Sequence, residues 1–308
     1  MRKEEWINQC LYRLSFKDLS LDYLKHLAEL AKAEDLEGAG LANPPTVYGD
    51  LSSNLLQAKG TGRASLVSRE SLVVCGLPVV PVILETYHPK LNFEPASQDG
   101  MVVQPNESLG TIHGPVKELL TAERVLLNFL QSISGVTSET RRYAEALGDS
   151  PTKLLDTRKT TPGYRMLQKY AVATGGGWNH RLGLFDRVIL KDNHLAANQS
   201  TSGDRLASLV DKAKEKNPDF LVEVEIDSLS QIAGILPSEP DIIMLDNFST
   251  EDLTRAVDFI GDRCCTEASG GITLENIQAL RQIGLDFIST SALVHHASWK
   301  DIGLDWIS

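Results

Sequence analysis

Five cationic side chains lie close together in the middle of the chain, at Arg158, Lys159, His180, Arg181 and Lys191. The whole chain carries a formal net charge of −11, yet residues 153–191 contain eight Lys and Arg residues against two acids, a local net charge of +6. Such a run of basic residues often forms only a solvent-exposed surface, whose charge is balanced by acidic residues elsewhere in the chain. If these side chains converge, however, their ligand must carry more than one negative group, because a single carboxylate does not offset the crowding of so many cations.

Carboxylates in two later segments supply the opposite charge. In VEVEI, Glu223 and Glu225 point to the same face of a predicted strand, and Asp246 follows the apolar run IIML at the next strand end. Two hard oxygen ligands on adjacent strands suit Mg²⁺ or a transition state that carries positive charge. The alternatives are a structural ion pair with inward-pointing lysines and, for Asp246, a helix N-cap before Thr250 and Glu251.

A phosphate-binding loop is indicated by EASGGITLENI. Ser269, Gly270 and Gly271 allow close backbone approach to a ligand, and a helix predicted to begin near Thr273 would direct free N–H groups at it. The chain contains neither a GxxxxGK[ST] nor a GxGxxG motif, which excludes a P-loop and a Rossmann dinucleotide turn. An SGG sequence alone is equally consistent with a plain loop before a capped helix.

The elements that position these residues form a repeat. After about residue 150, six short apolar segments end in polar residues and alternate with helical stretches: KLLDTRK, RVILKDNH, DFLVEVEID, DIIMLDN, RCCTEASGG and LDFISTSA. This alternation predicts a parallel sheet with right-handed crossovers, closed as a barrel or left open. The carboxyl ends of parallel strands meet at one rim, so the polar residues are expected to converge there.

The first part of the chain predicts a smaller mixed domain. Residues 21–36 have the spacing of a helix, and the apolar stretches that follow are broken by Pro, Gly and Asn as strands joined by turns would be. From Gly114 a long helix is expected, with Val116, Leu120, Arg124 and Leu127 along one face. Arg124 either extends to water from this face or enters an interface or site, where its planar group grips an anion.

Composition restricts the class of protein. With 42% hydrophobic and 23% charged residues, the 308-residue chain is typical of a soluble globular protein. No apolar run approaches the roughly 18 residues of a membrane span and no signal peptide is evident, so a cytoplasmic location is expected. The four cysteines show no metal-binding spacing, and the acidic balance argues against a general nucleic-acid binder.

Several long motifs together resemble one enzyme family. DTRKTTPG, KYAVATGGGWNHR, VILKDNH, VEVEI, IIMLDNFS and EASGGIT occur in the order and at the distances seen in quinolinate phosphoribosyltransferases, also called carboxylating nicotinate-nucleotide pyrophosphorylases. The resemblance is strong over residues 114–296. It is looser before that, through YGDLSSN, DGMVV and TAERVLLNFL.

The resemblance implies an incomplete (β/α) barrel, residues 133–296, with a smaller N-terminal α+β open-faced sandwich domain, residues 1–132, on which the tail 297–308 packs back. It also implies a homodimer, or a higher oligomer, with active sites shared between subunits. The reaction would join quinolinate to phosphoribosyl pyrophosphate with Mg²⁺, releasing pyrophosphate and CO₂ and giving nicotinate mononucleotide for NAD synthesis.

The resemblance also implies residue roles. Arg158, Lys159, His180, Arg181 and Lys191 would hold the two quinolinate carboxylates, with Arg124 reaching in from the partner subunit. Glu225 and Asp246 would lie near the ribose and a metal ion, and with Lys159 and Lys191 form the catalytic set. The phosphoribosyl phosphate would be bound by Ser269, Gly270, Gly271 and Ser291, together with the two acids.

The sequence departs from the family pattern at two places, and three other functions are possible alternatives. Ser291 stands where the family commonly has glycine after the last barrel strand, and the loop EDLEGAGLANPPTVYGD is longer than usual, which we interpret as a tolerated surface insertion. The rivals are a related protein with another ligand, such as a molybdenum-transport-associated relative, a barrel aldolase with Lys191 as Schiff-base nucleophile, and a non-catalytic anion-binding protein. The sequence KDNH favours quinolinate.

Overall fold

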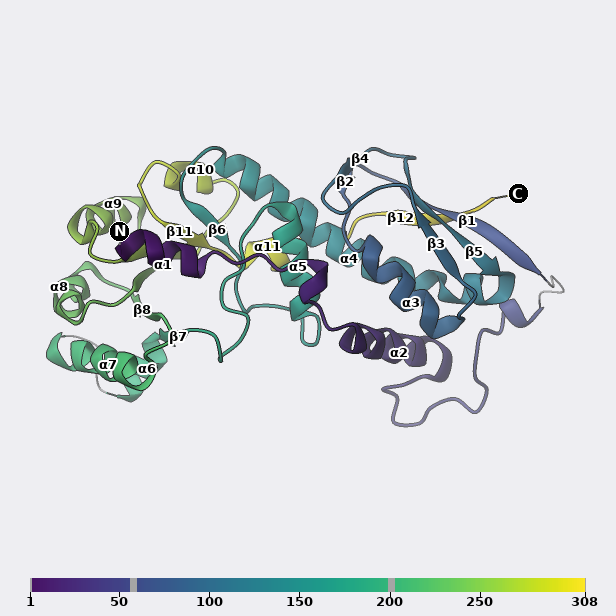
Figure 1. Ribbon diagram of the computed structural model, residues 1–308, viewed down its shortest axis with the longest axis horizontal. Helices are drawn as coiled ribbons and strands as arrows, with labels where there is room; N and C mark the ends of the chain where they lie inside the picture. The colour runs from purple at the N-terminus through teal and green to yellow at the C-terminus, as the bar shows by residue number, and fades with distance from the viewer. Residues whose placement is uncertain (1, 56–59, 199–202, 308) are drawn as a thin grey trace. The chain divides into compact units, whose positions relative to one another are not determined.

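The computed structural model describes residues 2–55, 60–198 and 203–307, which fall into two compact units (Figure 1). The first, here called the barrel unit, comprises Met1–Arg13, Thr140–Thr160 and Gly176–His296. The second, the sandwich unit, comprises Leu14–Glu139, Thr161–Gly175 and Ala297–Ser308. No helix in the described ranges has the length and apolar character needed to cross a membrane.

This division differs from the predicted boundary at residue 132. Helix α1, Arg2–Cys10, belongs to the barrel unit because it packs against β10, Cys265–Ser269, and buries Trp6 and Cys10. Helix α4, Val116–Leu147, continues across the boundary, and α5, Arg165–Gly175, belongs to the sandwich unit. These contacts join segments far apart in the sequence, which local patterns do not reveal.

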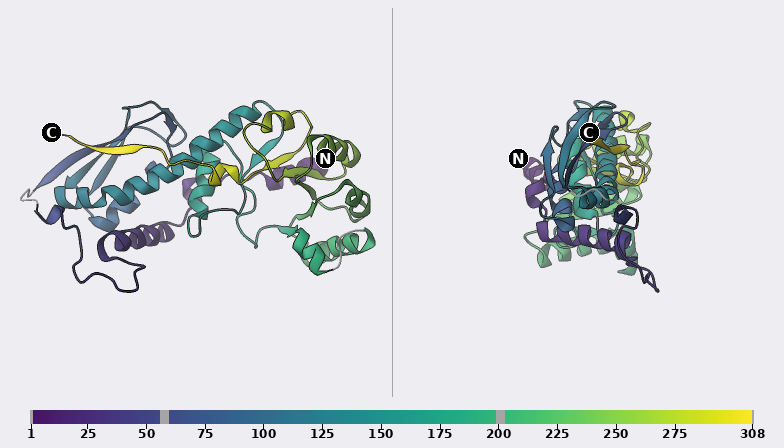
Figure 2. Two further views of the ribbon diagram at one scale, coloured as in Figure 1. Left: turned by 180° about the vertical axis from the view of Figure 1, so that it is seen from behind. Right: turned by 90° about the vertical axis from the view of Figure 1, so that its right-hand side faces the viewer.

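The sandwich unit contains a four-stranded antiparallel sheet in the order β12-β1-β5-β3. The strands are β1, Thr61–Ser68, β3, Asn92–Pro95, β5, Ser108–Pro115, and β12, Ile302–Ile307, with a separate pair formed by β2, Leu72–Val73, and β4, Val102–Val103. Strand β12, yellow in Figures 1 and 2, runs antiparallel along β1, so the end of the chain is part of this unit.

Helices complete the sandwich unit. Helix α2, Leu21–Glu37, begins at Ser20, whose side chain accepts a hydrogen bond from the Tyr23 N–H group, and it ends at Gly38 in the left-handed conformation. The unit also contains α3, Val80–Tyr87, and the 3₁₀ turns Phe16–Asp18, Ser53–Leu55 and Leu77–Val79.

Helix α4 buries a wide stripe that includes one residue of the predicted face. Its buried positions include Leu119, Ala122, Leu126, Phe129, Leu130 and Ile133, which recur at helical spacing, and Leu127 of the predicted face is buried as well. Arg124 is exposed, and Val116 and Leu120 beside it are only partly buried. Of the two alternatives for Arg124, extension to water agrees with this exposure, and a role in an interface or site stays a prediction.

The barrel unit is built on a six-stranded parallel sheet in the order β6-β11-β10-β9-β8-β7. All six predicted strand segments form strands: β6, Lys153–Leu155, β7, Val188–Leu190, β8, Val222–Ile226, β9, Ile242–Asp246, β10, and β11, Phe287–Ser289. In the described ranges β6 and β7 do not pair with each other, so the barrel is incomplete.

Helices and 3₁₀ turns connect the strands of the barrel unit. They are α6, Asp192–Ala197, α7, Gly203–Lys216, α8, Ile232–Ile235, α9, Thr250–Ile260, α10, Ile277–Leu280, and α11, Ala292–His295, with 3₁₀ turns at Leu229–Gln231 and Leu236–Ser238. Helices α7 and α9 pack against β8 and β10 from outside the sheet (Figure 1).

The strand register arranges inward-facing residues in layers. Glu225, Met244 and Glu267 lie at paired positions of β8, β9 and β10, and Asp246 pairs with Ser269 one layer nearer the carboxyl ends. Paired residues of parallel strands face the same side of the sheet. The acidic side chains therefore share the interior, and Asp246 and Ser269 reach its rim.

Candidate active site

A pocket of about 640 Å³ opens at the carboxyl ends of the barrel strands. It is lined by all of the predicted site residues except Arg124: Arg158, Lys159, His180, Arg181, Lys191, Glu225, Asp246, Ser269, Gly270, Gly271 and Ser291. Glu225, Asp246 and Ser269 lie at or near the carboxyl ends of β8, β9 and β10. The other residues come from the segments that follow β6, β7, β10 and β11 and from the segment that precedes β7, so most of them obey the rule of converging carboxyl ends. Arg124 belongs to the sandwich unit and does not line this pocket.

The loop after β6 presents Arg158 and Lys159. It is held by two local hydrogen bonds: the Lys159 N–H group donates to Thr157 Oγ1 (3.0 Å), and the Thr160 N–H group donates to the Arg158 carbonyl (3.0 Å). Lys159 is exposed. The Nε–H group of Arg158 is buried and has no acceptor among the described residues. A buried N–H group without an acceptor is stabilised when a ligand supplies the acceptor.

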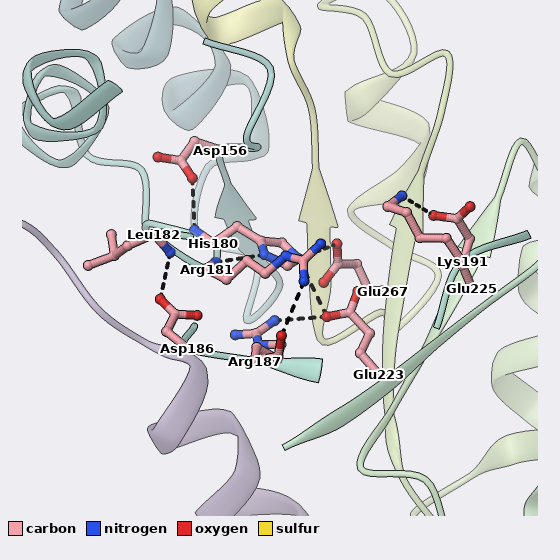
Figure 3. Close-up of polar contacts among 10 residues, drawn as sticks. All are labelled: Asp156, His180, Arg181, Leu182, Asp186, Arg187, Lys191, Glu223, Glu225 and Glu267. Atoms are coloured by element: carbon pink, nitrogen blue, oxygen red, sulfur yellow. Dashed lines mark hydrogen bonds and ion pairs between the residues drawn. The ribbon is translucent and has the colours of Figure 1, made fainter. Parts of the chain in front are cut away.

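The segment that carries His180 and Arg181 is anchored to the end of β6. Asp156 accepts a hydrogen bond of 2.8 Å from the His180 N–H group (Figure 3). It also accepts one of 2.8 Å from Asn179 Nδ2. Arg13 donates to the carbonyl groups of Gly176 and Gly177 and stacks on Trp178. Gly176, with a φ of +104°, permits the turn after α5, and Asp156 and Arg13 fix the segment that follows.

Arg181 is nearly buried at the pocket wall. Its Nη1 donates to the Arg187 carbonyl at 3.1 Å. Burial lowers the pKa of the Arg181 guanidinium, and the positive charge of Arg158 lowers it further. Two neighbouring cations in a poorly hydrated wall repel each other, so an anionic ligand between them is favoured.

A network of charged groups lies beneath the pocket, inside the sheet (Figure 3). Arg187 Nη1 lies 3.0 Å from Glu223 Oε2, and His180 Nε2 lies 3.5 Å from the same oxygen and 3.3 Å from Glu267 Oε1. Burial raises the pKa of the Glu223 carboxyl, but its contacts with His180 and Arg187 outweigh burial and lower this pKa to about 2. Glu223 therefore pairs with an arginine rather than with the inward-pointing lysine considered from the sequence.

The carboxylates at the rim are Glu225 and Asp246. Lys191 Nζ forms an ion pair with Glu225 Oε2. Burial raises the pKa of the Asp246 carboxyl, and the negative charge of Glu225 raises it further. Lys191 and Lys159 act in the opposite direction and lower the pKa of Asp246. The oxygen donors of the two carboxylates, on adjacent strands, fit Mg²⁺. The N-cap alternative for Asp246 is wrong, because Ser249 caps α9 by accepting from the Asp252 N–H group.

The glycine loop after β10 differs from its prediction. Gly270 has a φ of +85°, and a Cβ atom there would lie 2.2 Å from Asn247 Oδ1. A helix does not begin near Thr273: α10 starts at Ile277, because Asn276 Oδ1 accepts from the Thr273 N–H group and Asn276 Nδ2 donates to the Gly271 carbonyl. A ligand here would meet loop N–H groups and hydroxyls rather than the end of a helix.

Ser291 is accommodated without backbone strain. Its φ is −80° and its ψ is −11°, a conformation that any residue adopts. Its carbonyl accepts from the N–H groups of Val294 and His295 and so begins α11. The side chain lines the pocket, where it adds a hydroxyl to the wall.

The pocket contains further polar residues that sequence reasoning missed: Thr157, Asn247, Thr273, Ser289, Thr290 and His296. Asn247 has a φ of +57°, and its Nδ2 donates to Asp246 Oδ2 at 2.7 Å, so it fixes the orientation of that carboxylate. The signal was present in the sequence, because Asn tolerates the left-handed conformation and directly follows a strand end.

Fold and site together define a class of enzyme. A parallel α/β sheet whose pocket, at the strand carboxyl ends, is lined by cations, carboxylates and a glycine loop is suited to binding a phosphorylated substrate beside a multivalent anion. The arrangement stabilises charge on both partners of a group transfer.

Comparison with known proteins identifies the family. Residues 136–305 match the C-terminal domain and residues 50–134 the N-terminal domain of quinolinate phosphoribosyl transferase. A probable carboxylating nicotinate-nucleotide pyrophosphorylase from Synechocystis is 38% identical over 260 residues, which cover 83% of this chain and 86% of the relative. The chloroplastic carboxylating nicotinate-nucleotide pyrophosphorylase of Arabidopsis thaliana is 37% identical over 296 residues, covering 91% of this chain and 82% of that protein.

A solved structure agrees with the sequence relatives. The nicotinate-nucleotide pyrophosphorylase from Francisella tularensis superposes with a TM-score of 0.85 at 33% identity, covering 96% of this chain and all of that chain. The chain therefore belongs to the quinolinate phosphoribosyl transferase family.

Proposed function

We propose that the chain is a carboxylating nicotinate-nucleotide pyrophosphorylase, a pentosyltransferase of NAD biosynthesis. It transfers the phosphoribosyl group of phosphoribosyl pyrophosphate to quinolinate and releases pyrophosphate and CO₂, giving nicotinate mononucleotide. Family membership supports this activity. The observation that carries it is the pocket itself, which joins a cationic wall, a pair of carboxylates and a glycine loop at a single rim.

The cationic wall would bind the pyridine dicarboxylate. Arg158 offers a buried Nε–H group without an acceptor among the described residues, and Arg181 is held in the wall by the Arg187 carbonyl. Lys159 and Lys191 add charge from the loops after β6 and β7. Because guanidinium groups pair with carboxylates in a bidentate manner, the two arginines orient the ring as well as neutralise it.

The acidic side of the pocket would bind the ribose. When pyrophosphate leaves, positive charge develops at the ribose, and the carboxylates of Glu225 and Asp246 stabilise it electrostatically. The same two residues would hold Mg²⁺, which offsets the charge of the leaving pyrophosphate. Ser269, Gly270, Gly271 and Ser291 line the neighbouring wall and would bind phosphate oxygens.

Decarboxylation follows alkylation of the ring nitrogen. The pyridinium nitrogen withdraws electrons, so the adjacent carboxylate leaves as CO₂ and its bonding pair remains on the ring carbon. A proton is then needed at that carbon. The ammonium groups of Lys159 and Lys191, or a water molecule held by them, are suited to supply it.

A direct assay tests the activity. Purified protein, Mg²⁺, quinolinate and phosphoribosyl pyrophosphate are mixed, loss of quinolinate absorbance is followed, and nicotinate serves as the comparison substrate. We expect turnover of quinolinate only. Equal or better use of nicotinate would refute the substrate assignment. Borohydride trapping with a carbonyl substrate should give no adduct at Lys191, which is ion-paired rather than placed in the dry, uncharged surroundings of a Schiff-base lysine.

We also propose a cytoplasmic homodimer whose active sites use Arg124 of the partner subunit. The exposure of Arg124 beside the partly buried Val116 and Leu120 supports a partner surface on α4. Mixing inactive Arg124→Ala subunits with inactive Lys191→Ala subunits should restore part of the activity. If a confirmed heterodimer shows no recovery, the shared site is refuted.

A further inference from the structure

His180 is more deeply buried than its neighbours Arg181 and Glu225 in the proposed site. Family resemblance gives it a role in holding the quinolinate carboxylates, which requires a ring nitrogen directed into the pocket. The structure instead places its imidazole against two carboxylates inside the sheet, in what we call the buried triad: His180, Glu223 and Glu267 (Figure 3). The His180 side chain is only 6% exposed and both carboxylate side chains are fully buried.

Both ring nitrogens of His180 are already committed. Nδ1 accepts a hydrogen bond of 2.7 Å from the Arg181 N–H group. Burial lowers the pKa of the His180 imidazole, but the negative charges of Glu267 and Glu223 outweigh burial and raise this pKa to about 9, which favours a second ring proton. The contact with the Arg181 N–H group opposes that proton, because a nitrogen that accepts a hydrogen bond carries none. We follow the contact and assign the single ring proton to Nε2. Nε2 has less than 1 Å² of exposed surface and faces Glu267 Oε1 at 3.3 Å and Glu223 Oε2 at 3.5 Å. Neither nitrogen is left to donate to a substrate carboxylate.

The same tautomer argues against a metal ion in the buried triad. Its three ligand atoms lie within 4.8 Å of one another, which is close enough for a shared cation. A histidine binds a metal through an unprotonated nitrogen, however, and the nitrogen that faces the carboxylates carries the proton. Arg187, at 3.0 Å from Glu223, already supplies a positive charge. The triad is therefore a set of buried electrostatic contacts between the imidazole and the two carboxylates.

Two chains of contacts lead from this network to Arg181. In the first, Glu223 holds the Arg187 guanidinium, and the Arg187 carbonyl accepts from Arg181 Nη1 at 3.1 Å. In the second, Glu223 and Glu267 fix the His180 ring, and Nδ1 of that ring holds the backbone N–H group of Arg181. Arg181 is thus fixed at its side chain and at its backbone from the same buried carboxylates.

We propose that His180 is a positioning residue that sets the place of Arg181, and that Glu267 acts on quinolinate binding only through this ring. This inference rests on the proposed function. Neither carboxylate oxygen of Glu267 forms a hydrogen bond of ordinary geometry with a described residue. The electrostatic contact with His180 therefore offsets the cost of burying the Glu267 charge. Glu267 does not line the pocket, and any effect of it on the substrate must therefore travel through its neighbours.

The tautomer can be measured directly in the wild-type protein. With ¹⁵N-labelled histidine, the His180 signal is recognised by slow solvent exchange of its ring proton, because His180 is the one buried histidine among the described residues. We expect Nε2 protonated and Nδ1 unprotonated, with no change when quinolinate is added to saturation. A proton on Nδ1 in the free protein, or a change of protonation on binding, would overturn the proposal.

A double-mutant cycle tests the route from Glu267 to the substrate. Glu267→Gln should raise KM for quinolinate about tenfold and leave KM for phosphoribosyl pyrophosphate within about twofold. In an Arg181→Ala background the same change should have less than about a twofold further effect. Glu251→Gln, an exposed acid at the start of α9, is the matched control and should change neither value. Losses that multiply in the double variant would show that Glu267 does not act through Arg181.

The outcomes separate this inference from the proposed function. If the wild-type protein does not turn over quinolinate, the proposed function fails, while the ¹⁵N signals of the free protein still decide whether the ring nitrogens are committed. If Glu267→Gln does not fold, as judged by circular dichroism, the labelled wild-type protein still gives the decisive result. Active wild-type protein with Nδ1 protonated would refute the inference alone.

Discussion

Replacing Arg187 by methionine is the most informative test of the electrostatics beneath the pocket. The substitution keeps an unbranched side chain of similar length and removes the positive charge that lies 3.0 Å from the buried Glu223 carboxylate. Breaking a buried ion pair by removing one partner leaves an uncompensated charge, which destabilises a protein by about 3–5 kcal/mol. We expect a loss of this size at pH 7.

The pKa of Glu223 gives a second estimate of the magnitude. Lowering this pKa from its ordinary value of 4.5 to about 2 corresponds to about 3 kcal/mol of stability. Because the pKa is lower in the folded protein, this stability is present above pH 4.5 and is lost as the pH falls toward 2. His180 contributes the larger part of this lowering and Arg187 the smaller part, so removing Arg187 removes only part of the contribution. The difference between wild type and variant should therefore narrow between pH 7 and pH 3, by less than about 2 kcal/mol.

The assay must report on the barrel unit. Trp6 and Trp178 lie in this unit, and Trp299 and Trp306 lie in the sandwich unit, so a background with the latter two changed to phenylalanine makes fluorescence specific. Urea unfolding is followed at both pH values. Arg255→Met, which removes a 64% exposed arginine from a surface pair with Asp252, is the control and should cost less than about 1 kcal/mol.

Two results would refute this reasoning. An Arg187→Met variant within about 1 kcal/mol of wild type at pH 7 would mean that the pair contributes no more than a surface ion pair. A loss that stays the same at pH 3 would mean that it comes from packing of the arginine stem rather than from its charge.

Three further predictions concern the rim of the barrel. Gly270→Ala should reduce activity more than tenfold, because the new Cβ atom would lie 2.2 Å from Asn247 Oδ1. Gly271→Ala should lose less activity, because no atom lies within 4 Å of its Cβ position. Steady-state kinetics with varied phosphoribosyl pyrophosphate measures both variants, and equal losses would contradict this reasoning. Arg181→Ala should reduce kcat/KM for quinolinate by an amount equivalent to about 2–5 kcal/mol. Lys159→Ala removes an exposed lysine, so its loss should lie at the lower end of that range. A larger loss for Lys159→Ala than for Arg181→Ala would contradict the observed burial. Removal of divalent cations with a chelator should abolish turnover and added Mg²⁺ should restore it, while full activity in the chelator would exclude a role of Glu225 and Asp246 as metal ligands.

The sequence predicted most of the pocket because its residues obey one local rule. Arg158 and Lys191 follow the apolar strands β6 and β7, Asp246 ends the apolar strand β9, and Ser269 ends β10. Parallel strands bring such ends together. Alternation within VEVEI likewise placed Glu225 inside the sheet. These inferences needed only chain periodicity and the handedness of the crossovers.

The sequence predictions were wrong where a side chain had several possible hydrogen-bond partners that local sequence rules do not distinguish. Asn276 takes the N–H group of Thr273 and so delays α10, and Ser249 rather than Asp246 caps α9. Glu267 passed unnoticed because one carboxylate in CTEAS has no local partner; the ring that it meets comes from His180, far earlier in the chain.

Sequence alone determined the alternating strands and helices, the rim at which their polar ends meet and the family to which the motifs point, because periodicity, turn chemistry and long matched motifs are properties of the chain itself. Tertiary structure alone decided the partners of the buried charges: Arg187 for Glu223, both carboxylates for the imidazole of His180, and the Arg181 N–H group for its other nitrogen. Desolvation makes such pairings obligatory, but only the packed sheet settles which groups lie within hydrogen-bonding distance.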